Sequence, residues 1–109
     1  MNEEINIFKC LDFIRDNSEA YAIAKANRQY LENYRKTVKA QQMKNHLSLP
    51  VSAQEREAYA SDELQTVDLG IKAAMEEEVR LQWLLIAAQI KCEAWRSIQA
   101  NARTEAKIL

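Results

Sequence analysis

The sequence predicts an all-α protein, with one short and two long helices that form a single hairpin or bundle domain over 1–109. Only one glycine and one proline occur in 109 residues, and these are residue types that mark turns and end helices. Alanine, glutamate, glutamine, lysine and leucine, which favour helix, are abundant. Apolar residues in the C-terminal half recur at steps of three and four, as on one face of a helix.

The first predicted helix covers residues 1–16. Ile5, Phe8 and Leu11 are spaced three apart and form one apolar stripe. Asn17 and Ser18 interrupt this stripe, and a serine side chain commonly accepts a hydrogen bond from the first free amides of a helix. We therefore expect the chain to break here and Ser18 to cap a second helix.

The second predicted helix covers 19–46, which contain neither glycine nor proline. Its apolar positions form a thin stripe of mostly small or aromatic residues: Ala20, Ala24, Leu31, Tyr34 and Val38. A thin stripe buries one narrow seam and leaves the rest of the helix in water. A loop is expected at 47–52, because Pro50 disfavours helical backbone at Leu49.

The C-terminal helical region is predicted at 53–107. Ser52 and Glu55 have the spacing of a capping box, which predicts a short helix ending near Tyr59. Ser61 and Asp62 are compatible both with the start of a new helix and with continuation of the first. Beyond them only Gly70 disfavours helix, and the sequence leaves open whether the helix bends there.

One row of positions on this helix alternates steps of four and three, as in the heptad seam of a coiled coil. The row is Leu64, Val67, Ile71, Ala74, Glu78, Leu81, Leu85, Ala88, Cys92, Trp95, Gln99 and Ala102, with Glu78 and Gln99 as polar interruptions. Between Val79 and Ile98 the apolar face is wider, so more than one side of the helix needs cover. We expect a homo-oligomer assembled through Leu81, Trp83, Leu85, Ile86, Ile90 and Trp95. The alternative is that the N-terminal helix folds back and covers this face alone.

Charge is unevenly distributed although the formal net charge is −1. Residues 21–46 carry one acidic residue and six basic ones: Lys25, Arg28, Arg35, Lys36, Lys39 and Lys44. Tyr21, Tyr30 and Tyr34 lie among them, and basic side chains with aromatic rings are typical of single-stranded nucleic-acid binding. Residues 51–89 are acidic on balance. The alternative is that the basic helix pairs with the acidic one, in the same or a neighbouring protomer.

No catalytic, metal or cofactor site is expected. Glu76, Glu77 and Glu78 are consecutive, so on a helix their side chains point about 100° apart and do not converge. His46 has no acidic or thiol neighbour in the sequence, and a zinc site needs about four ligands. The sequence therefore predicts a protein that is not an enzyme.

The expected compartment is the cytoplasm. The two cysteines, Cys10 and Cys92, lie far apart in the sequence and lack a CxxC pattern, which favours reduced thiols. No run of about 20 apolar residues is present to span a membrane. The first residues are acidic, whereas a signal peptide begins with basic ones.

Two stretches of the C-terminal half carry a family resemblance: residues 61–67, SDELQTV, and residues 80–86, RLQWLLI. Upstream lie a helix that begins with Tyr21, Ala24 and Ala26, a lysine-rich continuation and a loop. Together, over about 21–107, they resemble the UvsY family of recombination mediators from T-even bacteriophages.

The resemblance implies a ring-like homo-oligomer that binds single-stranded DNA in a bacterial host cell. Such a mediator helps a phage or host recombinase to displace the single-stranded-DNA-binding protein, and it has no enzymatic activity or cofactor. By this resemblance the DNA contacts would come from Arg35, Lys36, Lys39 and Lys44, with Lys25 and Arg28 on the same helix. The chain departs from the family in being shorter and in its segment before the loop. The alternative function is a phage-encoded helical interaction or inhibitor protein that docks on a host protein.

Overall fold

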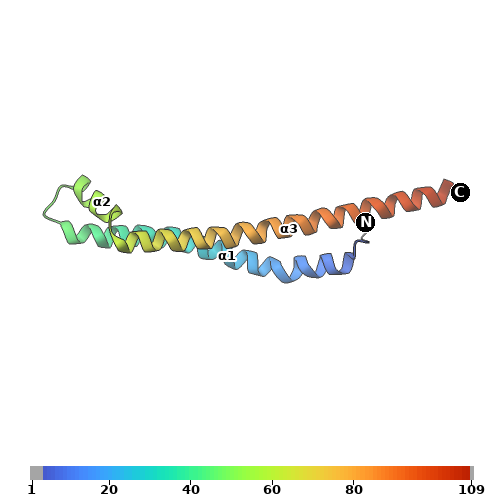
Figure 1. The fold of residues 1–109 in the computed structure, drawn as a ribbon, viewed down its shortest axis with the longest axis horizontal. Coiled ribbons are helices and arrows are strands. Elements are labelled where there is room, and N and C mark those ends of the chain that lie inside the picture. The colour runs from blue at the N-terminus through green and yellow to red at the C-terminus, as the bar shows by residue number, and fades with distance from the viewer. Residues whose placement is uncertain (1–3, 109) are drawn as a thin grey trace. The chain divides into compact units, whose positions relative to one another are not determined.

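The structure, a computed structural model, describes residues 4–108, and all regular structure within them is helical (Figure 1). The elements are α1 (Ile7–Met43), a short 3₁₀ helix η1 (Lys44–His46), α2 (Val51–Tyr59) and α3 (Asp62–Ile108). The predicted all-α class is therefore confirmed. Residues 1–3 of the first predicted helix lie outside the described residues. Among helices of the described part, none has the combined length and hydropathy needed to cross a membrane.

The predicted break at Asn17 and Ser18 is wrong, because α1 runs through both residues as one helix of 37 residues. Asn17 Nδ2 donates a hydrogen bond to the carbonyl oxygen of Phe13 at 2.9 Å, and the Ser18 hydroxyl donates one to the carbonyl oxygen of Ile14. Both side chains thus bond one turn back along the helix instead of capping a new one. The predicted helices 1–16 and 19–46 are parts of a single element.

The ends of α1 differ from the predicted boundaries by a few residues. Asn6 caps its start, where the Asn6 Oδ1 atom accepts a hydrogen bond of 3.1 Å from the backbone amide of Lys9. At the other end the chain tightens into η1 after Met43. The loop that follows covers only 47–50, since α2 already begins at Val51.

The predicted capping box at Ser52 and Glu55 is also wrong. Pro50 occupies the N-cap position of α2, and its carbonyl oxygen accepts the amide of Ala53 at 3.0 Å. Ser52 consequently lies inside the first turn. Glu55 does not turn back to the Ser52 amide but faces Lys39, with Nζ and Oε1 3.8 Å apart.

A new helix does start after Ser61, which settles the boundary that the sequence left open. The Ser61 hydroxyl accepts a hydrogen bond of 3.3 Å from the amide of Leu64 and donates one of 2.6 Å to the carbonyl oxygen of Ala58. Ser61 therefore links the end of α2 to the start of α3. Helix α3 then runs 47 residues without a break, so Gly70 does not interrupt it.

The chain divides into two compact units. Unit 1 combines the start of α1 with the second part of α3 (Met1–Tyr21 and Val79–Leu109), and unit 2 is Ala22–Glu78. Within unit 2, α1 and α3 lie side by side in opposite directions (Figure 1), since Arg28 contacts Glu78 while the later Arg35 contacts the earlier Asp68.

The predicted seam of α3 is the side that the chain buries. Leu64, Leu81 and Ala88 are buried, as is Glu78, which the sequence presents as an interruption. Other seam positions up to Trp95 are half-buried, whereas Gln99 and Ala102 are exposed. The seam thus ends near Trp95.

The buried side of α1 in unit 2 differs from the predicted stripe. Ala24 and Val38 are buried as expected, but Tyr34 is 43% exposed. Arg28 and Arg35 are half-buried instead, in step with Ala24, Leu31 and Val38 at alternating spacings of four and three. A long arginine stem can lie along apolar surface while its charged end reaches an acidic partner. Counting only the apolar residues therefore underestimates how much of this side of α1 is buried.

Candidate interaction surfaces

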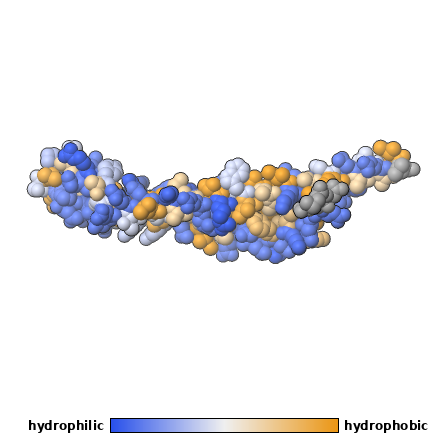
Figure 2. Space-filling view, viewed as in Figure 1, coloured by the Kyte–Doolittle hydropathy of each residue, from blue (hydrophilic) through white to orange (hydrophobic). Residues whose placement is uncertain are grey.

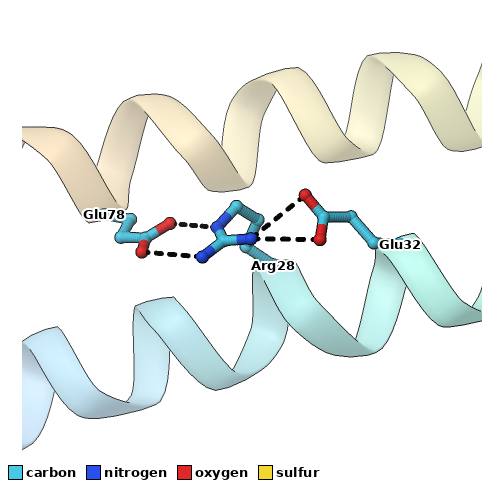
Figure 3. A network of polar contacts seen from close by, with 3 residues as sticks. All are labelled: Arg28, Glu32 and Glu78. Atoms are coloured by element: carbon cyan, nitrogen blue, oxygen red, sulfur yellow. Dashed lines mark hydrogen bonds and ion pairs between the residues drawn. The ribbon is translucent and has the colours of Figure 1, made fainter.

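Arg28 lies between two carboxylates (Figure 3). Its guanidinium is paired with Glu78 of α3 through Nε and Nη2, the latter 3.1 Å from Oε1. Its Nη1 atom donates to both carboxylate oxygens of Glu32, one turn along α1, at 3.0 and 3.1 Å. This arrangement occupies most of the donors of a guanidinium group.

A second set of contacts surrounds Tyr59 at the end of α2. Arg35 Nε donates to Asp68 Oδ1 at 2.6 Å, and its guanidinium carbon lies 5.6 Å from the centre of the Tyr59 ring. Lys39 Nζ lies 4.7 Å from the same ring centre and 3.8 Å from Glu55 Oε1. Two cations from α1 thus flank one aromatic ring, each with an acidic partner nearby.

These contacts favour the charged forms of the groups involved. The hydrogen bond from Arg28 lowers the pKa of Glu78, and hydrogen bonds to Glu78 and Glu32 raise the pKa of Arg28. The hydrogen bond to Asp68 raises the pKa of Arg35, while the hydroxyl of Tyr59 raises the pKa of Lys39. Half of the six predicted DNA-binding residues are therefore engaged within the chain, as in the alternative of a basic helix paired with an acidic one.

The other three predicted DNA-binding residues, Lys25, Lys36 and Lys44, are exposed. Tyr30 and Tyr34 are exposed on α1, the helix that carries Lys25 and Lys36, with exposed fractions of 66% and 43%. Their rings are stacked, with centroids 6.2 Å apart and planes inclined by 7°. Exposed lysines and an exposed aromatic pair thus both occur on α1, on different sides of the helix, while Lys44 lies in η1.

The six predicted oligomerisation residues separate into two groups. Leu81 is buried, and Leu85 and Trp95 are half-buried along the seam. Trp83 and Ile90 are 64% and 59% exposed, and the half-buried Ile86 lies between them on the same side of α3. The first three residues therefore contribute to the packing of the single chain, and only the second group remains available to a partner.

An outward apolar face remains on α3. It consists of Val79, Trp83, Ile86 and Ile90, which alternate steps of four and three. Each lies two positions before a seam residue, about 200° away around the helix. Apart from the half-buried Ile86, all are more than 40% exposed. Figure 2 shows hydrophobic side chains gathered over unit 1, where this face lies, whereas unit 2 is largely hydrophilic in that view.

Sequence reasoning missed the acidic partners Glu78, Asp68 and Glu55. Glu78 offered a signal, because a carboxylate in an otherwise apolar seam needs a cation opposite it. Arg28 and Arg35 offered the matching signal, since they continue the three-and-four spacing of the α1 stripe. Neither signal identifies the pairs without the alignment of the two helices.

No group of three or more histidine, cysteine, aspartate or glutamate side chains in residues 4–108 is arranged to hold a metal ion. Comparison with protein-family models, curated proteins and solved structures gives no match to this chain. The resemblance to recombination mediators therefore stays a prediction.

Proposed function

We propose that this protein functions by binding, and that it assembles with further copies of itself through the outward face of α3. The observation that carries the proposal is the position of Trp83 and Ile90, large apolar residues that lie opposite the buried seam and are mostly exposed. Exposed apolar residues in a contiguous row are typical of protein interaction sites.

The energies favour a face with several large side chains on each copy. Burying one such side chain contributes about 1.5–3 kcal/mol, and association costs about 4–15 kcal/mol in lost freedom. A single tryptophan does not offset this cost, whereas four apolar residues from each of two copies can. The ten residues 81–90 include no charged residue, so two copies can meet there without like-charge repulsion.

The test is the molar mass in solution, measured by light scattering after size-exclusion chromatography. We expect wild-type protein to exceed the single-chain mass of 12.6 kDa. The double variant Trp83→Gln, Ile90→Gln should fall toward that mass while keeping its helical circular dichroism. Ile98→Gln is the matched control, because Ile98 is 55% exposed but lies about a quarter turn away from this face.

A wild-type protein that stays monomeric up to high concentration would contradict self-assembly. The outward face would then need a different protein as partner, as in the hypothesis of a phage-encoded inhibitor. In that case the Trp83→Gln, Ile90→Gln variant would lose the partner and not the oligomer.

Single-stranded DNA binding is a second candidate, supported by the stacked and exposed pair Tyr30 and Tyr34 on a helix that also carries the exposed lysines Lys25 and Lys36. Bases stack on aromatic rings regardless of sequence, at about 1–3 kcal/mol per base. We propose Lys25, Lys36 and Lys44 as the phosphate contacts, a smaller set than the six residues predicted from the sequence. An oligomer would multiply these weak sites by effective concentration, and a recombinase with its single-stranded-DNA-binding protein would be the further partners.

Fluorescence anisotropy of a labelled oligo-dT strand at several salt concentrations tests this candidate. The slope of log K for binding against log salt concentration should become less steep by about 0.7 for each phosphate contact that is lost. The triple variant Lys25→Gln, Lys36→Gln, Lys44→Gln is compared with Lys72→Gln, an exposed lysine on α3. Absence of binding at low salt, or equal binding by the triple variant, would contradict it.

A further inference from the structure

A narrow groove separates α1 from α3 within unit 1. It is lined by Lys9, Cys10, Phe13, Leu84, Ala87, Ala88 and Lys91. Cys10 therefore faces α3 in the immediate neighbourhood of Lys91, the residue before Cys92. The two cysteines are 82 positions apart in the sequence, and the packing of the two helices brings them together.

Cys10 lines this groove together with Ala88 and Lys91, which lie one turn and one residue before Cys92, so the Cys10 and Cys92 side chains are neighbours across the two helices. Both residues are half-buried and both are free thiols. Burial, followed by the contact with Cys10, raises the pKa of the Cys92 thiol. The raised pKa favours the protonated form of the Cys92 thiol.

We propose that Cys10 and Cys92 form an intramolecular disulfide on exposure to a peroxide, which ties α1 to α3 covalently in unit 1. Two half-buried free thiols that lie on facing surfaces of packed helices need little backbone movement to reach bonding distance. The bond would hold the N-terminal part of α1 on α3, whereas the reduced protein holds it by packing alone.

The chemistry balances with hydrogen peroxide as the oxidant. The thiolate of Cys10 attacks one peroxide oxygen, the O–O bond breaks, and a sulfenic acid and hydroxide form. The sulfur of Cys92 then attacks the sulfenic sulfur, the S–O bond breaks, and its thiol proton leaves with the hydroxyl group as water. Overall, two thiols lose two electrons and two protons, and peroxide is reduced to two molecules of water. A small dithiol reverses the change by thiol–disulfide exchange.

Mass spectrometry of the intact protein after treatment with hydrogen peroxide tests the proposal. We expect a product lighter than the reduced chain by two hydrogen atoms, a cross-linked peptide containing Cys10 and Cys92 after digestion, and recovery of both thiols with dithiothreitol. The closed loop of about 80 residues should raise the melting temperature by at least about 5 °C.

The controls distinguish this bond from general oxidation. Cys10→Ser and Cys92→Ser should each abolish the mass change and the rise in melting temperature. The double variant Cys92→Ser, Glu93→Cys keeps two cysteines but moves one about 100° around α3, so it should not form the intramolecular bond. Disulfide-linked dimers, stepwise oxygen addition without the cross-linked peptide, or equally rapid bonding in the shifted variant would each overturn the proposal.

Discussion

Glu78 illustrates how one residue can be misjudged by its type. In the sequence it is an acidic interruption of an apolar seam, yet it is buried beside Arg28, which also holds Glu32. A buried carboxylate without a partner would destabilise the fold. The pairing therefore specifies which part of α1 lies against which part of α3 in unit 2.

At the scale of the residue we predict that Glu78→Gln lowers the melting temperature at neutral pH, because it removes the negative charge opposite Arg28. Glu76→Gln should have little effect, since Glu76 is exposed. Thermal unfolding followed by circular dichroism measures both.

The same variant gives a pH-dependent prediction. Since Arg28 lowers the pKa of Glu78 in the folded state, this residue stabilises the fold fully above the ordinary glutamate value of 4.5. This stabilising contribution is lost as the pH falls through the lowered pKa that Glu78 has in the folded state. The difference between wild type and Glu78→Gln should therefore shrink on acidification, and a difference that stays constant down to acid pH would contradict this account.

At the scale of the element, the side-chain hydrogen bonds that form determine where a helix begins, and the residue type alone does not. Ser18, Ser52 and Ser61 are all of a residue type that commonly caps helices, but of the three only Ser61 does so. Ser18 bonds back to its own helix, and Ser52 lies inside α2 after Pro50.

We predict that Ser61→Ala destabilises the fold by about 0.5–2 kcal/mol, the usual cost of removing a helix cap. Ser52→Ala is the matched control and should be close to neutral, because Ser52 does not cap α2. Urea unfolding curves measure both free energies. Equal losses in the two variants would show that Ser61 contributes nothing as a cap.

We also predict that Gly70→Ala stabilises the protein by about 1 kcal/mol, since alanine favours helix over glycine. A β-carbon at this position would lie 3.9 Å from Leu31 Cδ1, an ordinary van der Waals contact. The reverse change Ala73→Gly, at an exposed position of α3, should destabilise by a similar amount. Destabilisation by Gly70→Ala, measured by urea unfolding, would mean that the glycine is required for packing.

At the scale of the whole molecule, the two proposed binding modes respond differently to salt. Phosphate contacts weaken as salt rises because binding releases counterions, whereas burial of an uncharged apolar face does not depend on such release. We predict that added sodium chloride weakens oligo-dT binding but leaves the oligomer intact. Sedimentation velocity and anisotropy on the same samples measure both, and dissociation of the oligomer by salt would indicate assembly through ion pairs.

The sequence by itself determined the helical class, the presence of a long C-terminal helix, and the row of positions with seam spacing on it. These follow from composition and from apolar spacing, which are local properties of the chain. Only the tertiary structure decided that Arg28, Arg35 and Lys39 face acidic partners, and that Leu81 is buried while Trp83 is exposed. Which charges pair, and which side of a broad apolar helix is covered, depend on the alignment of segments distant in sequence.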